Sequence, residues 1–212
     1  MKTIAFISHK GGVGKSTLAI HLAVQAHLRG LETLLVDLDR ISSTASEWAS
    51  IRQKEQPVVV TAELPDIPEL FQQAKEEKFD LLILDCPPYL TEEVLEVSRR
   101  VANCTLLPVP PRFPELQSLS KFINVLDCTY FAVLNSCVPD NDDADSFGLS
   151  EVCQMLEDHN IPVSPAHISR LEAFSDALNK GAAVSERERG SEANGQIEEL
   201  LDWIKDSVGL AK

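Results

Sequence analysis

Residues 8–17 read Ser8-His9-Lys10-Gly11-Gly12-Val13-Gly14-Lys15-Ser16-Thr17, a glycine-rich segment between an apolar run and a helix-length stretch. Glycines allow the backbone to turn tightly and to point its N–H groups at phosphate oxygens. The helix predicted from Ser16 adds unpaired N–H groups and the positive end of its dipole. Lys15 can reach the β- and γ-phosphates of a nucleotide, and the Ser16 hydroxyl can bind Mg²⁺. The segment therefore predicts a P-loop, the alternative being a fortuitous glycine-rich turn.

On both sides of this segment, short apolar runs alternate with amphipathic stretches. Successive apolar residues, as in the run LLILD at 81–85, are typical of parallel strands covered on both faces. The predicted strands are 2–8, 33–37, 58–62, 81–85, 105–108, 131–135 and 163–168. The predicted helices are 16–29, 44–54, 66–77, 91–101, 114–127, 147–159 and 196–208. This order predicts an α/β fold of the P-loop NTPase class, a single domain over residues 1–212, with a mostly parallel sheet of about seven or eight strands flanked by helices on both faces.

The composition limits the classes of protein that the chain can belong to. Across 212 residues, 33 acidic side chains outnumber 19 basic ones, and the formal net charge is −14. This balance excludes a basic protein that coats nucleic acid, although a local basic patch stays possible. No apolar run reaches the roughly 18 residues of a membrane span, and the N-terminus lacks the features of a signal peptide. We expect a soluble cytoplasmic protein that does not bind membranes.

The cysteines agree with that expectation. The chain has Cys86, Cys104, Cys128, Cys137 and Cys153, and none of them forms a CxxC pair or a spacing typical of metal sites. We expect them to be small buried hydrophobic residues in a reducing compartment.

Two stretches are predicted to be loops. Residues 138–146 hold four aspartates and no basic residue, which favours a solvated loop over a calcium site because the glutamate and glycine of an EF-hand are missing. Residues 183–195 are rich in charge and glycine. The helix predicted at 196–208 has an acidic polar face and is therefore a poor ligand for anionic lipid; its acidic residues are Glu198, Glu199, Asp202 and Asp206.

Acidic residues end two of the predicted strands. Asp37 and Asp39 lie at the end of the second strand, where parallel sheets bind their ligands. Asp85 ends the run LLILD, which is the Walker B pattern of apolar residues followed by a carboxylate that holds Mg²⁺, usually through water. The pattern is weak alone and becomes strong beside a P-loop. For Asp37, the cap of a helix or turn is an alternative role.

The second lysine, Lys10, stands directly before the glycine pair, and the segment resembles the KGGxGK[ST] signature of the deviant Walker A ATPases, the ParA/MinD family. The likeness runs nearly end to end and is closest to the small, ParF-like plasmid-partition type. It includes Pro108-Val109-Pro110-Pro111, then Ile168-Ser169-Arg170 followed by residues 180–186, and finally Gly190, Ala193 and residues 195–198. Where relatives often read DxDPQGS, this chain has Arg40 and Ile41 in place of Pro-Gln, a departure in the first switch loop, residues 38–43.

The resemblance implies roles for individual residues. Asp39 would position the attacking water, and Lys10 would reach across a nucleotide-sandwich homodimer to the phosphates of the partner subunit, much as an arginine finger does. Asp37 would support the Mg²⁺ shell, and Asp85 would hold the ion through water. The implied ATP-binding residues are Lys10, Gly11, Gly12, Val13, Gly14, Lys15, Ser16, Thr17 and, at the adenine, Asn135, which could equally be a simple turn residue.

The resemblance also implies nonspecific DNA binding by the ATP-bound dimer. No segment precedes the first predicted strand, so we expect no helix-turn-helix domain and no operator recognition. The densest basic cluster near the C-terminus is Arg170, Lys180, Arg187 and Arg189. Because Glu186, Glu188 and Glu192 are interleaved with it, these residues could also be ordinary solvated charges. Binding through them would weaken steeply with salt.

The leading hypothesis is a ParA-type partition ATPase with ATP and Mg²⁺ as cofactors. ATP-dependent dimerisation would hold it on nucleoid DNA, and a ParB-like or adaptor partner on the cargo would stimulate slow hydrolysis. The cargo, a plasmid, a chromosome or a protein assembly, is left open. The alternatives are a MinD-like membrane-cycling ATPase, a metabolic or redox P-loop enzyme, and a nucleotide switch with little hydrolysis.

Overall fold

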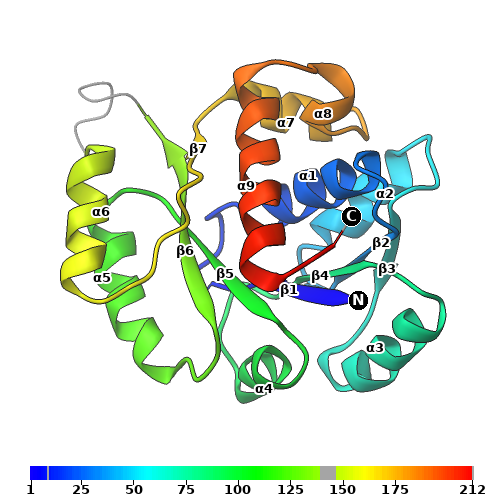
Figure 1. Cartoon of the computed structure of the whole chain (residues 1–212), viewed down its shortest axis with the longest axis horizontal. Helices are drawn as coiled ribbons and strands as arrows, with labels where there is room; N and C mark the ends of the chain where they lie inside the picture. The colour runs from blue at the N-terminus through cyan, green and yellow to red at the C-terminus, as the bar shows by residue number, and fades with distance from the viewer. Residues whose placement is uncertain (9, 139–146, 212) are drawn as a thin grey trace.

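The computed structural model describes residues 1–8, 10–138 and 147–211. These residues form a seven-stranded sheet in the order β3-β2-β4-β1-β5-β6-β7, in which every pair is parallel (Figure 1). The strands are β1 (Lys2–Phe6), β2 (Thr33–Asp37), β3 (Val58–Thr61), β4 (Leu81–Asp85), β5 (Cys104–Val109), β6 (Tyr130–Cys137) and β7 (Ile168–Ser169). The predicted fold class is confirmed.

Helices cover both faces of this sheet (Figure 1). On one face lie α1 (Lys15–Leu28), α2 (Thr44–Ile51), α7 (Glu172–Leu178), α8 (Val184–Arg187) and α9 (Glu192–Val208). On the other lie α3 (Ile67–Glu76), α4 (Glu92–Arg100), α5 (Phe113–Phe122) and α6 (Leu149–Asp158), with the short 3-10 helices η1 (Leu64–Asp66) and η2 (Ile123–Val125) between elements.

Alternate residues of the central strand feed two separate hydrophobic cores. Ile4 and Phe6 of β1 pack with α1 and α9, whereas Ala5 and Ile7 pack with the helices of the other face. Because helices cover both faces of the sheet, β1, β2, β4 and β5 are buried at nearly every position, and the interiors of these strands are mostly apolar. This double burial explains the continuous apolar runs of the sequence.

The register brings the acidic strand ends together. Asp37 of β2 and Phe6 of β1 are both the Cα partners of Asp85 in β4. The glycine-rich segment begins two residues after Phe6, so the P-loop and both carboxylates lie at the same edge of the sheet.

The structure corrects several predicted boundaries near the C-terminus. The strand predicted at 163–168 is reduced to Ile168–Ser169, with an isolated bridge between Ala132 and Val163. Helix α7 was not predicted. The loop predicted at 183–195 contains α8 and the first turns of α9, which begins at Glu192 rather than at 196 because the Ser191 side chain accepts a hydrogen bond from the Asn194 N–H.

Other predictions were partly correct or fall outside the described residues. All five cysteines, which lie within the described ranges, are free, but only Cys86, Cys104 and Cys137 are buried; Cys128 and Cys153 are half-buried. His9 and the aspartate-rich loop from 139 to 146 lie outside the described residues. In the described part of the chain, no helix combines the length and apolar character needed to cross a membrane.

Candidate nucleotide-binding site

The glycine-rich loop ends at Gly14, which caps the N-terminus of α1 with a left-handed backbone (φ 94°). Among the described residues, no side chain accepts a hydrogen bond at this cap, and no acidic residue occupies the first turn of α1. The first N–H groups of α1 therefore keep their capacity for an anion, and the positive end of the helix dipole is not neutralised. This is the local geometry that binds phosphate.

Asn135 packs directly against the P-loop. It lies at the end of β6, is 6% exposed, and its Nδ2 donates a hydrogen bond of 2.7 Å to the Val13 carbonyl. A Cβ built on Gly14 would lie 2.1 Å from the same Nδ2, so a larger residue here would force Asn135 to move, and the left-handed backbone also favours glycine. The described contacts make Asn135 a residue that positions the P-loop, and a contact with adenine stays a prediction.

Lys15 and Asp85 are buried side by side at the phosphate end of the loop, with exposed fractions of 6% and 1%. Burial lowers the pKa of Lys15, opposed mainly by the carboxylate of Asp85 and less by that of Asp39. Burial raises the pKa of Asp85 to about 7, opposed in part by the adjacent Ser16 hydroxyl. Neither carboxylate oxygen of Asp85 has a hydrogen-bond partner of good geometry within the described residues. A buried, unsatisfied carboxylate beside Ser16 fits a site for a hydrated Mg²⁺.

Asp37 caps α2 in this structure. Its Oδ2 accepts hydrogen bonds of 2.9 Å from both the N–H and the hydroxyl of Ser46, and its Oδ1 accepts one of 3.0 Å from the Asp39 N–H. The observed contacts of Asp37 are therefore those of a helix cap, which is the alternative role that the sequence left open. A role in the Mg²⁺ shell stays a prediction.

Asp39 holds the first switch loop. Its Oδ1 accepts hydrogen bonds from the N–H groups of Ile41 (3.1 Å) and Ser42 (3.2 Å). Arg40, the residue that departs from the family pattern, forms an exposed ion pair with Glu63 at the start of η1. The loop is thus held by hydrogen bonds within its own backbone region and by an ion pair to Glu63, and the carboxylate expected to orient water is engaged with the loop backbone.

Lys10 contacts its own chain. Its Nζ donates a hydrogen bond of 3.3 Å to the Pro114 carbonyl, in the first turn of α5. Action on the phosphates of a partner subunit therefore requires this exposed hydrogen bond to break.

An open groove of about 370 Å³ adjoins the P-loop. Its walls include Gly12, Gly14 and Asn135 together with residues that sequence reasoning did not single out; those are Thr44, Ser136, Leu171, Phe174, Ser175, Leu178 and Asn179. Arg170 also lines the groove, whereas Lys180, Arg187 and Arg189 are exposed on residues 180–189, which follow α7 and include α8. The predicted basic cluster is therefore divided between two places.

A parallel sheet whose central strand runs into a glycine-rich loop, with a buried lysine and a buried acidic strand end beside it, defines a P-loop nucleotide-binding protein. Residues 4–184 match the sequence model of the CobQ/CobB/MinD/ParA nucleotide binding domain, and the chain belongs to this family. Membership of the ParA/MinD family is thus confirmed. The closer likeness to the ParF-like type stays a prediction.

Similar proteins agree with this assignment. Maintenance of carboxysome distribution protein A of Gloeobacter kilaueensis is 31% identical over 217 aligned residues, which cover 96% of each chain. The chromosome-partitioning ATPase Soj of Thermus thermophilus is 28% identical over 60% of this chain and 62% of its own. The septum site-determining protein MinD of Pyrococcus horikoshii, solved with Mg-ADP, has a TM-score of 0.80 at 17% identity, over 100% of this chain and 99% of the other. At that identity the structural likeness bears on the fold alone.

Proposed function

We propose that the chain is a ParA/MinD-type positioning ATPase that binds ATP with Mg²⁺ and hydrolyses it slowly. The observation that carries the proposal is the buried pair Lys15 and Asp85 beside the open N-terminus of α1, in which both carboxylate oxygens of Asp85 lack a hydrogen-bond partner among the described residues. Phosphate oxygens would compensate Lys15, and Mg²⁺ held by Ser16 and, through water, by Asp85 would neutralise the charge of the phosphates.

The hydrolytic step would use Asp39 and Lys10. Asp39 would release the amides of Ile41 and Ser42 and orient the attacking water. Lys10 of one subunit would leave Pro114 and stabilise the phosphoryl charge in the other subunit, which makes hydrolysis depend on a nucleotide-sandwich dimer. A partner on the cargo would favour this rearrangement.

DNA binding would use the exposed basic residues Lys180, Arg187 and Arg189, which lie within one short segment. Because the chain carries a net charge of −14, the positive surface would have to be assembled from both subunits of the ATP dimer. This arrangement would place the protein on the nucleoid only in its ATP state. The relatives named for carboxysome distribution and for chromosome partitioning support a protein assembly and a chromosome as the first cargoes to test.

The first test compares retention of the Asp39→Ala protein on nonspecific double-stranded DNA with ATP and with ADP across a salt series. Retention with ATP only, weakening steeply with salt, supports the proposed cycle. Absence of retention in both states, with ATP binding confirmed by titration, would remove DNA from the proposal. Liposomes in a parallel arm test the MinD-like alternative, against which the acidic face of α9 argues.

A second candidate is a nucleotide switch with little hydrolysis. The engagement of Asp39 with two backbone amides, in a loop held by the Arg40–Glu63 ion pair, favours it. Single-turnover phosphate release decides between the two. Release that depends on Asp39 supports the ATPase, and no Asp39-dependent release under any condition supports the switch.

A further inference from the structure

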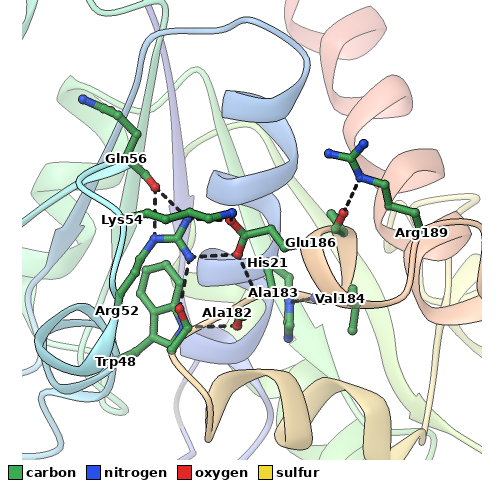
Figure 2. Close-up of polar contacts among 12 residues, drawn as sticks. His21, Trp48, Arg52, Lys54, Gln56, Ala182, Ala183, Val184, Glu186 and Arg189 are labelled. Carbon is green, nitrogen blue, oxygen red and sulfur yellow. Dashed lines mark hydrogen bonds and ion pairs between the residues drawn. The ribbon is translucent and has the colours of Figure 1, made fainter.

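Arg52, directly after α2, is a buried arginine paired with a glutamate far along the chain. Its side chain is 3% exposed and that of Glu186 is 6% exposed. Nη1 donates to Oε2 and Nη2 to Oε1 of Glu186, each at 2.8 Å, which is the bidentate geometry of a strong charge-assisted pair (Figure 2).

The remaining donors of the guanidinium are also used. Nε and Nη2 donate to the Gln56 carbonyl at 3.0 and 2.6 Å, and Nη1 donates to the Gly181 carbonyl at 3.1 Å. The guanidinium also lies 4.7 Å from the centroid of the Trp48 ring. All five N–H groups of the side chain are therefore engaged, which fixes its orientation.

Glu186 is equally constrained. Besides Arg52, its Oε1 accepts a hydrogen bond from Lys54 Nζ at 2.8 Å, and its Oε2 accepts one from the Ala183 N–H at 3.0 Å (Figure 2). Burial raises the pKa of Glu186, but these hydrogen bonds outweigh it and bring the pKa to about 2. The carboxylate therefore stays charged, and the pair persists, across the physiological pH range.

Further contacts join α1 and α2 to α7 and to residues 181–184. Trp48 of α2 donates from Nε1 to the Ala182 carbonyl at 3.2 Å. His21, fully buried in α1, accepts the Val184 N–H on Nδ1 and contacts the Phe174 carbonyl through Nε2, both at 3.3 Å. A Cβ on Gly181 would lie 2.7 Å from the Ile51 carbonyl, so the two backbones are in direct contact.

The segment held in this way is the one that carries the exposed basic residues. Lys180 directly precedes Gly181, and Arg187 directly follows Glu186. The two helices that hold this segment both begin at the nucleotide site. Helix α1 begins at Lys15 in the P-loop, and α2 begins after the first switch loop. One buried network thus connects both nucleotide-facing elements to residues 180–189.

We propose that the Arg52–Glu186 pair is a positioning device, which transmits the nucleotide state of the P-loop and first switch loop to the basic surface formed by Lys180, Arg187 and Arg189. The inference rests on the proposed function and adds the regulation of its DNA-binding surface. Because the pair ties residues 180–189 to α2, the two basic surfaces of a dimer would take a defined relative orientation only when nucleotide fixes the helices that carry them.

The test needs a variant that folds without the pair. Removing one partner leaves a buried charge uncompensated, whereas replacing both by apolar residues of similar size is often neutral for stability. The variant is therefore Arg52→Met/Glu186→Leu. Its matched control is Arg99→Ala/Glu92→Ala, which removes a more exposed pair on α4, on the opposite face of the sheet. Circular dichroism and titration with a nonhydrolysable ATP analogue and Mg²⁺ establish that both fold and bind.

The first readout is amide hydrogen exchange at residues 180–189, with and without the analogue. We expect the analogue to slow exchange in this segment in the wild type and in the control. In the Arg52→Met/Glu186→Leu protein we expect slowing only at the P-loop and α2. Slowing of residues 180–189 in that variant, or no slowing there in the wild type, would overturn the inference.

The second readout separates this inference from the proposed function. We expect the ratio of DNA affinities with analogue and with ADP to fall by about tenfold in the Arg52→Met/Glu186→Leu protein and to stay unchanged in the control. A Lys180→Ala/Arg187→Ala/Arg189→Ala protein should lose DNA retention but keep the exchange response. If the wild type shows the exchange response without retention on DNA, the pair couples the nucleotide site to residues 180–189 as inferred, and the proposed DNA binding is wrong.

Discussion

The side-chain amide of Asn135 donates a 2.7 Å hydrogen bond to the carbonyl of Val13, in the middle of the phosphate-binding loop. The contact joins the end of β6 to a loop that begins after β1, two strands away in the sheet. A glycine-rich loop has few side chains of its own to hold it, so this bond and the close approach of Asn135 to Gly14 help to position it.

Asn135→Ala should weaken nucleotide binding by about tenfold, the upper range for the loss of one buried hydrogen bond. If Asn135 acts through the P-loop, affinities for ATP and GTP fall in the same proportion, because both present the same phosphates. Parallel titrations with the two nucleotides measure this. A loss confined to ATP would instead identify the adenine contact that the sequence predicts.

Gly14→Ala should destabilise the nucleotide-free protein more than Gly12→Ala. Both glycines have left-handed backbones, with φ of 94° and 77°, so both substitutions share a backbone cost of about 1–2 kcal/mol. Of the two, only the Cβ at Gly14 meets a neighbour among the described residues, at 2.1 Å from Asn135 Nδ2, and we expect about 1–3 kcal/mol of additional destabilisation in urea unfolding. When Asn135 is also replaced by alanine, the additional destabilisation caused by Gly14→Ala should be smaller. An equal cost in both backgrounds would contradict the close approach.

The fold could be predicted where the sequence pattern is local and strong. Continuous apolar runs such as Leu81–Asp85 are what a doubly covered parallel strand requires, and the glycine-rich segment identified the turn from β1 into α1. The C-terminal region was predicted poorly because its structure depends on distant contacts. Helix α8 has only four residues, and Glu186 within it is held by Arg52, 134 positions earlier.

Within the site, too, residues of local motifs could be predicted from the sequence, whereas contacts between distant segments could not. Lys15, Ser16 and Asp85 belong to motifs whose spacing implies their chemistry, and they come together at one edge of the sheet. The contacts of Asp37 with Ser46 and of Asn135 with Val13 involve ordinary residue types with no motif of their own. Only the three-dimensional arrangement of the strand ends reveals them.

His21 should make stability depend on pH. Burial lowers its pKa from 6.5 to about 4, opposed by the Phe174 carbonyl and by Glu186, so the folded chain keeps the ring neutral while the unfolded chain protonates it. The contribution of His21 is therefore complete above about pH 6.5 and declines as the pH falls towards 4, amounting to a loss of about 2 kcal/mol by about pH 5.

Because the raised pKa of Asp85 acts in the opposite sense over part of this range, the measurement is the difference between the wild type and His21→Asn. Urea unfolding from about pH 8 to about pH 5 should show the two stabilities converging as the pH falls. A constant difference across that range would show that His21 does not titrate between the folded and unfolded states.

Lys10 donates a hydrogen bond to Pro114 of its own chain. Whether Lys10 acts on the nucleotide of its own subunit or on that of the partner can be tested by mixing two variants. Lys10→Ala alone should bind ATP and lose partner-stimulated hydrolysis, and Asp39→Ala alone should bind ATP without hydrolysing it. In a mixed dimer, the site of the Lys10→Ala subunit keeps its own Asp39 and receives Lys10 from the Asp39→Ala subunit, so one complete site is restored. We expect the mixture to recover about half the activity per dimer, less the share of unmixed dimers. If Lys10 acted within its own chain, neither site of the mixed dimer would be complete and the mixture would stay as inactive as its components.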